Sequence, residues 1–162
     1  MPNILGISLK TKHLGTAVLY DGELVDFRVR TFYGVWTSEK RSDMLRTINK
    51  AVDRFGVTAI VVKAPKPAHC SNSILDILSD IERVAEQGKI KLTLCTISEL
   101  KKRYSKNESG NKQTLIQAII AKYPNHRQLA QLYAKEKSNR NAYHVKIFEA
   151  IACAELALGT EH

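Results

Sequence analysis

Lysine and arginine side chains gather in three short stretches of the sequence, and the chemistry open to them is the binding of phosphate groups. The first stretch spans residues 10–12, the second surrounds the polar segment SKNESGN at 105–111, and the third spans residues 135–140. Their cations are Lys10, Lys12, Lys101, Lys102, Arg103, Lys106, Lys112, Lys135, Lys137 and Arg140. Such groups neutralise nucleic-acid phosphates. One cluster alone is also typical of a solvated surface, but three that converge predict a phosphate-binding face.

The whole chain is basic, with a formal charge of +9 and a pI near 9.5. Nucleic acid is the commonest polyanionic partner, although charge alone also fits a basic surface without one. Its 162 residues, 44% of them hydrophobic, suffice for one compact domain over 1–162. The composition therefore predicts a single basic domain, either with an anionic partner or with a basic surface that has none.

Several other classes of protein lack their motifs here. The sequence contains no GxxxxGK[ST], GxGxxG, GxSxG or HExxH, and His69-Cys70 has no second pair of metal ligands nearby. Three scattered cysteines without CxxC spacing favour buried, reduced thiols. No apolar run is long enough for a membrane span, and the N-terminus lacks the order of a signal peptide. We therefore expect a cytoplasmic protein with no membrane partner.

Hydrophobic periodicity predicts the elements that must position the basic clusters. Residues 3–9 and 14–20 are apolar, β-branched runs, and a turn at 21–23 precedes a third strand over 24–32. Apolar residues at helical spacing then predict an amphipathic helix that starts at Ser38 and ends at Gly56. The chain should therefore open with three antiparallel strands and a helix.

The next segments alternate between strand and helix. The run VTAIVVKAP at 57–65 predicts a strand buried on both faces in the middle of the sheet, and IKLTLCTI at 90–97 predicts another. Between them, 71–88 reads as a helix ended by Gly88. The remainder is predicted to be helical over 98–104, 112–124, 126–137 and 142–158, the last helix being rich in alanine. Parallel pairing with right-handed crossovers follows from this order.

This order is the one expected of an RNase H-like α/β fold with a mixed five-stranded sheet flanked by helices. Locally, GISLKTKHLG at 6–15 resembles the GIDPGTxxxG opening of the RuvC-type Holliday junction resolvases. The stretch at 95–120 resembles their segment P-x-x-VKK-x-x-x-G-x-G-x-A-x-K-x-x-V, and FEAIACAELAL at 148–158 resembles their final ADALALAL helix. The resemblance spans nearly the whole chain and implies a homodimer that contacts branched DNA.

The catalytic acids of that family are mostly replaced in this sequence. The family holds two divalent ions, Mg²⁺ or Mn²⁺, with clustered carboxylates. The first acid corresponds to Ser8, and the acid that ends the fourth strand corresponds to Lys63, or to Val62 if the register slips by one. The pair on the last helix corresponds to Lys146 and Glu149. The resemblance therefore implies poor metal binding and no cofactor, with the lysines pairing with Glu149 instead.

Other acidic or ligating residues are weaker candidates for such a site. His144 lies five residues before Glu149 rather than three, so it would join the same helix face only in a shifted register. Asp21, Glu23 and Asp26 could supply acids, but DGE between two strands is more simply a hairpin turn. These residues leave one alternative open, in which a rearranged site around Glu149 and His144 cleaves nucleic acid with a metal ion.

Aromatic side chains follow the third predicted strand, where Tyr33 and Trp36 could stack on unpaired bases or pack on the protein.

The sequence thus predicts a catalytically degenerate RuvC-like domain that binds nucleic acid, DNA rather than RNA, without cutting it. No residue is assigned to catalysis or to a metal. Phosphate contacts are assigned to Lys10, Lys12, Lys101, Lys102, Arg103, Lys106, Lys112 and Arg140. Besides the metal-dependent nuclease, a pseudoenzyme whose basic face meets an acidic protein stays open.

Overall fold

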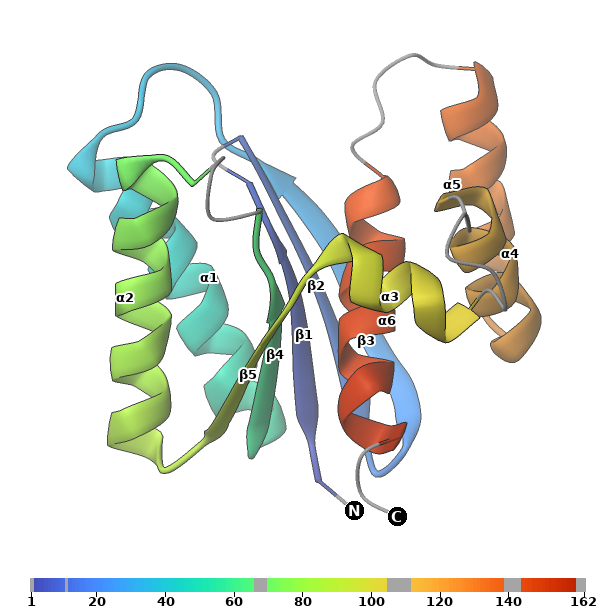
Figure 1. Cartoon of the computed structure of the whole chain (residues 1–162), viewed down its shortest axis with the longest axis horizontal. Helices are drawn as coiled ribbons and strands as arrows, with labels where there is room; N and C mark the ends of the chain where they lie inside the picture. Colours follow the sequence, from blue (N-terminus) through green and yellow to red (C-terminus); the bar gives the residue numbers. More distant parts are fainter. Residues whose placement is uncertain (1, 11, 66–69, 105–111, 139–143, 160–162) are drawn as a thin grey trace.

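The chain folds around one five-stranded sheet with helices on both faces (Figure 1). This computed structural model describes residues 2–10, 12–65, 70–104, 112–138 and 144–159. The strands are β1 (Ile4–Leu9), β2 (His13–Tyr20), β3 (Glu23–Thr31), β4 (Ala59–Lys63) and β5 (Lys91–Cys95). Their order is β3-β2-β1-β4-β5, in which β1, β2 and β3 pair antiparallel and β4 and β5 run parallel to β1. The predicted mixed sheet is confirmed.

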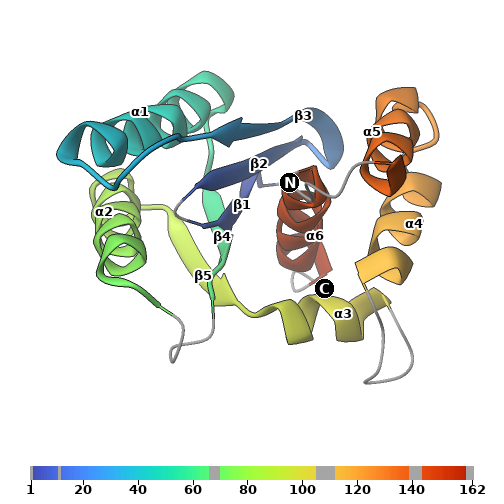
Figure 2. The ribbon, with the colours of Figure 1, turned by 90° about the horizontal axis from the view of Figure 1, so that it is seen from above.

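Two helical layers cover the sheet, as seen from above in Figure 2. One layer consists of α1 (Ser38–Phe55) and α2 (Asn72–Gly88). On the other face, α6 (Val145–Gly159) lies against the sheet. Around α6 lie α3 (Ile97–Tyr104), α4 (Lys112–Lys122) and α5 (Arg127–Ser138), with α4 and α5 on the side of α6 away from the sheet. Within the described ranges, no helix combines the length and hydrophobicity that a membrane span requires.

Most local backbone signals in the sequence are found in the structure. Asp21 and Gly22 adopt positive φ angles of 52° and 82° in the predicted hairpin turn, and Gly56 caps α1 with φ 56°. Gly88, by contrast, is the last residue of α2, and Lys89 takes the left-handed capping conformation at φ 53°. The strand β4 is fully buried as expected, but β1 is the central strand because the antiparallel pair β2–β3 extends the sheet on its other side.

The side chains of β1 point alternately to the two faces of the sheet, and each face contacts different helices. Leu5, Ile7 and Leu9 pack with α1 and α2, whereas the alternate residues, among them Gly6, face α6. A Cβ atom on Gly6 would lie 1.9 Å from the carbonyl oxygen of Ala150, and one on Gly15 would lie 2.3 Å from that of Lys146. The absence of these two side chains lets α6 lie directly against β1 and β2, as its alanines predicted.

Candidate functional site

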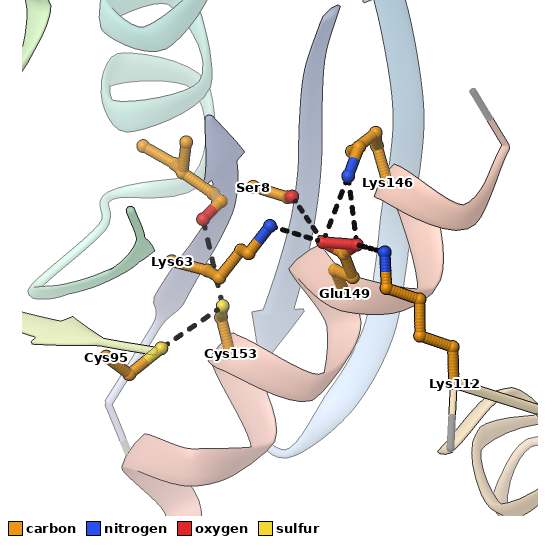
Figure 3. A network of polar contacts seen from close by, with 8 residues as sticks. Ser8, Lys63, Cys95, Lys112, Lys146, Glu149 and Cys153 are labelled. Atoms are coloured by element: carbon orange, nitrogen blue, oxygen red, sulfur yellow. Dashed lines mark hydrogen bonds and ion pairs between the residues drawn. The ribbon is translucent and has the colours of Figure 1, made fainter. Parts of the chain in front are cut away.

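A buried carboxylate, that of Glu149, lies where α6 crosses the end of β1 and collects four polar partners (Figure 3). The Ser8 hydroxyl donates to Oε2 at 3.0 Å, and the Lys63 ammonium lies 3.0 Å from the same oxygen. The Lys146 ammonium donates to Oε1 at 3.0 Å, and that of Lys112 lies 3.6 Å from Oε1. We call these five residues the lysine–glutamate cluster. The predicted pairing of Lys63 and Lys146 with Glu149 is confirmed.

The fold explains how residues so far apart in sequence meet. The parallel pairing of β1 with β4 sets Ser8 opposite Lys63 at the ends of both strands. Lys146 and Glu149 are three residues apart near the start of α6, so they share the helix face that meets the sheet. Lys112 is the first residue of α4 and reaches the carboxylate from the helical layer. The register slip that would have placed Val62 here does not occur.

Burial and charge act in opposite directions on the ionisable groups of the cluster. Burial alone would raise the pKa of Glu149, but the charges of Lys63, Lys146 and Lys112 outweigh it and hold that pKa at about 2. Burial lowers the pKa of Lys146 to about 8. The attraction of Glu149 raises this pKa, but repulsion from Lys63 offsets part of that effect. Three ammonium groups around one carboxylate leave an excess of two positive charges, 3 − 1. The cluster therefore attracts anions.

The donor set does not fit the two divalent ions of the RuvC-type site. Mg²⁺ and Mn²⁺ need several oxygen ligands, and protonated lysines have no lone pair to offer. The cluster supplies one carboxylate and one hydroxyl, and both already hydrogen-bond within it. Over the part of the chain that the structure describes, no three His, Cys, Asp or Glu side chains come together as metal ligands.

The acidic candidates Asp21 and Asp26 are engaged by residues other than those of the cluster. Asp26 is bound by the guanidinium of Arg28, at 2.8 and 3.1 Å. Asp21 lies in the turn at the opposite end of the sheet, where its N–H donates to the Asn3 side chain. His144 lies outside α6, half-buried, with its carbonyl accepting the Ile147 N–H at 3.0 Å.

The predicted phosphate-binding residues fall into separate groups. Lys10 and Lys12 are exposed in the β1–β2 hairpin, at the end of the sheet that carries the cluster, and the charge of Lys10 contributes to the lowered pKa of Lys146. Lys101, Lys102 and Arg103 lie on α3. Lys112 was assigned to phosphate by sequence, and it pairs with Glu149 while its side chain stays 44% exposed. Lys106, Arg140 and the side chains of Lys135 and Lys137 lie outside the described part.

The two aromatic candidates have different surroundings. Tyr33 is 87% exposed beyond β3, whereas Trp36 packs against the core under α1 and α2. Of the two side chains, Tyr33 is therefore the one that is mostly exposed to solvent.

Comparison with solved structures shows that the chain has an RNase H-like α/β fold, as predicted. Within that class it is similar to the Holliday junction resolvases. A Thermus thermophilus RuvC structure matches over 98% of this chain and 97% of the RuvC chain, with a TM-score of 0.73 and 14% identity. The yeast mitochondrial resolvase Ydc2 matches over 93% and 75% of the two chains, with a TM-score of 0.64 and 12% identity. A fowlpox virus resolvase bound to junction DNA matches over 98% and 97%, with a TM-score of 0.62 and 12% identity.

The predicted RuvC-like architecture is thus confirmed at the level of the fold. No protein-family model matches the sequence, and no curated protein matches it.

Proposed function

We propose that this chain is a RuvC-like domain that binds branched DNA without cutting it. The observation that carries the proposal is the state of Glu149, whose carboxylate is engaged by the Ser8 hydroxyl and three lysines. Two-metal hydrolysis needs carboxylates that are available to metal ions, and a site with this composition holds cations of its own instead.

Binding to DNA is supported by the fold and by the charge around the cluster. The T. thermophilus RuvC structure with a Holliday junction substrate matches with a TM-score of 0.73 and 12% identity, and the fowlpox virus resolvase was also solved with junction DNA. In this chain, Lys10 and Lys12 are exposed beside a cluster with excess positive charge. The lysines at this end of the sheet would attract approaching phosphates, as metal ions do in a two-metal site.

The first test is a titration on native gels of a labelled four-way junction, a duplex and a single strand, each with and without Mn²⁺. We expect a shift of the junction and no shortened products. Lys10→Gln/Lys12→Gln should weaken binding on the order of tenfold, whereas the matched change Arg83→Gln/Lys91→Gln, which removes exposed cations from α2 and β5, should change it less. Products that need Mn²⁺ and disappear in Glu149→Gln would instead establish the nuclease alternative.

Thermal melting with Mn²⁺ gives a second readout of the same proposal. The wild-type midpoint should move by less than about 1 °C, because a ligand that does not bind the folded state does not stabilise it. Ser8→Asp/Lys63→Glu/Lys146→Asp, which restores acids at the three substituted positions, should melt at a higher temperature once Mn²⁺ is added. A clear stabilisation of the wild type by Mn²⁺ would contradict the proposal.

The homodimer, the cytoplasmic location and the acidic protein partner stay predictions. Sedimentation of the purified chain with and without junction DNA would check the first of them.

A further inference from the structure

A cationic groove lies on the sheet face opposite α6, between β3 and α1, two elements that Figure 2 shows side by side. Its volume of about 380 Å³ is in the range of ligand-binding pockets. The charged residues that line it are Asp26, Arg28, Arg30, Lys50 and Arg54. Four cations against one acid give an excess of three positive charges, 4 − 1. The groove is separate from the lysine–glutamate cluster, because the sheet lies between them.

The spacing of residues in a strand and in a helix places two of these cations on one side of β3 and two on one side of α1. Arg28 and Arg30 alternate along β3 with Phe27 and Val29, which pack toward the core under α6. Lys50 and Arg54 are four residues apart on α1, so they lie on one side of that helix, and both are exposed. The two pairs therefore face the groove from opposite walls.

Several of the guanidinium groups are held in position. Arg28 is bound twice by Asp26, and Arg30 donates to the Thr47 hydroxyl at 2.7 Å while its Cζ lies 5.1 Å from the Phe32 ring centre. The Cζ of Arg54 also lies 5.1 Å from the ring centre of Phe55. A guanidinium has five N–H donors, and these hydrogen bonds use two on Arg28 and one on Arg30. Both arginines keep donors for a ligand, and little side-chain freedom is lost when it binds.

We infer that this groove binds the phosphodiester backbone of a second segment of the same branched DNA. The inference rests on the proposed function. Arginine forks match phosphate oxygens in pairs, and four cations along two walls suit a line of phosphates. The groove lies on the other face of the sheet, and β3 is two strands, roughly 10 Å, away from β1 and its Ser8. One phosphate cannot reach both surfaces. A junction offers separate arms to the two faces, whereas a short duplex offers only one.

The test compares junction and duplex binding of Lys50→Gln/Arg54→Gln with the matched control Arg83→Gln/Lys91→Gln, which removes the same charge from α2 and β5. We expect about tenfold weaker junction binding and a slope of log K against log salt that is smaller by about two, with duplex affinity changed less than about twofold. The control should leave junction binding near wild type. Circular dichroism checks the fold of each variant, and Lys50→Gln alone serves if the double variant does not fold.

The outcomes separate the groove from the proposed function. Wild-type junction affinity in the groove variant would overturn the groove and leave the proposed function standing. Equal losses on junction and duplex would overturn the assignment to a second segment. A wild-type chain that binds no DNA, even if it binds an acidic protein, would overturn both.

Discussion

Two glutamates on α6, Glu149 and Glu155, are equally buried but differ in the number of polar groups that pair with their carboxylates. Each side chain is 1% exposed. Glu149 has four partners, two of which, Lys63 and Lys146, are themselves buried. Glu155 pairs through one oxygen with Lys122, whose side chain is 51% exposed, and its other oxygen has no hydrogen-bond partner among the described residues.

Burial alone therefore does not distinguish these two carboxylates. The partners of Glu149 come from β1, β4, α4 and α6, so removing the carboxylate leaves like charges enclosed together. Glu155 joins only α4 to α6, and its cation can turn to water. The first carboxylate is a counter-ion for a charged site, and the second is a single link between two helices.

Removal of the Glu149 carboxylate should have the largest effect on stability. Glu149→Gln should lower the free energy of unfolding by about 3–5 kcal/mol, because it leaves Lys63 and Lys146 as buried charges without a counter-ion. Urea unfolding followed by circular dichroism measures this loss. The double change Glu149→Gln/Lys63→Met should recover part of it. A loss below about 1 kcal/mol in Glu149→Gln would mean that these lysines find other compensation.

The next effect is on the pH dependence of stability. The pKa of Glu149 is about 2 when folded, against an ordinary 4.5, so its ionised form favours folding. That contribution, roughly 3 kcal/mol, is complete above pH 4.5 and is lost as the pH falls toward 2. The pKa of Lys146 is about 8, below its ordinary 10.5, so its protonation opposes folding below pH 8. Stability should therefore gain a term of similar size as the pH rises from 8 to 10.5.

Urea titrations between pH 2 and 10.5 check both limbs of this curve. The acid limb should be absent from the curve of Glu149→Gln, and the alkaline limb should be absent from that of Lys146→Met. An acid limb of unchanged size in Glu149→Gln would assign the acid sensitivity to other carboxylates.

The smallest change is expected at the second carboxylate. Glu155→Gln should alter the free energy of unfolding by about 1 kcal/mol or less, because Lys122 is half exposed and the neutral amide is easier to bury. Lys122→Gln is the matched change on the partner. If Glu155→Gln destabilised the protein as much as Glu149→Gln, the contrast between the two glutamates would be wrong.

The sequence predicted those parts of the site that lie on regular elements. The resemblance to the RuvC-type resolvases implied Ser8 and Lys63, or Val62, at one site, and the observed parallel register of β1 with β4 places Ser8 beside Lys63. The spacing of Lys146 and Glu149 is local. The sequence assigned Lys112 only to phosphate binding. Lys112 and Glu149 are 37 residues apart, and no sequence pattern between them predicts which side of α4 packs on α6.

The sequence contained the two pairs of cations that line the groove, but it did not predict that the pairs meet. Arg28 and Arg30 alternate on a strand, and Lys50 and Arg54 are spaced by one helical turn. Each pair alone reads as an exposed polar face, and only the packing of α1 beside β3 joins them. The cap at Lys89 was missed for a different reason, since a lysine carries no preference for the left-handed conformation.

The contact of α6 with β1 has a consequence for how the chain comes to be folded. Ser8 and Glu149 are 141 residues apart, and the sheet face formed by Ile4, Ala17 and Leu19 is covered by this last helix. During synthesis the first hairpin must wait, with its apolar face uncovered, until α6 has left the ribosome. Translation interrupted before α6 would yield fragments that expose this face and are prone to aggregate.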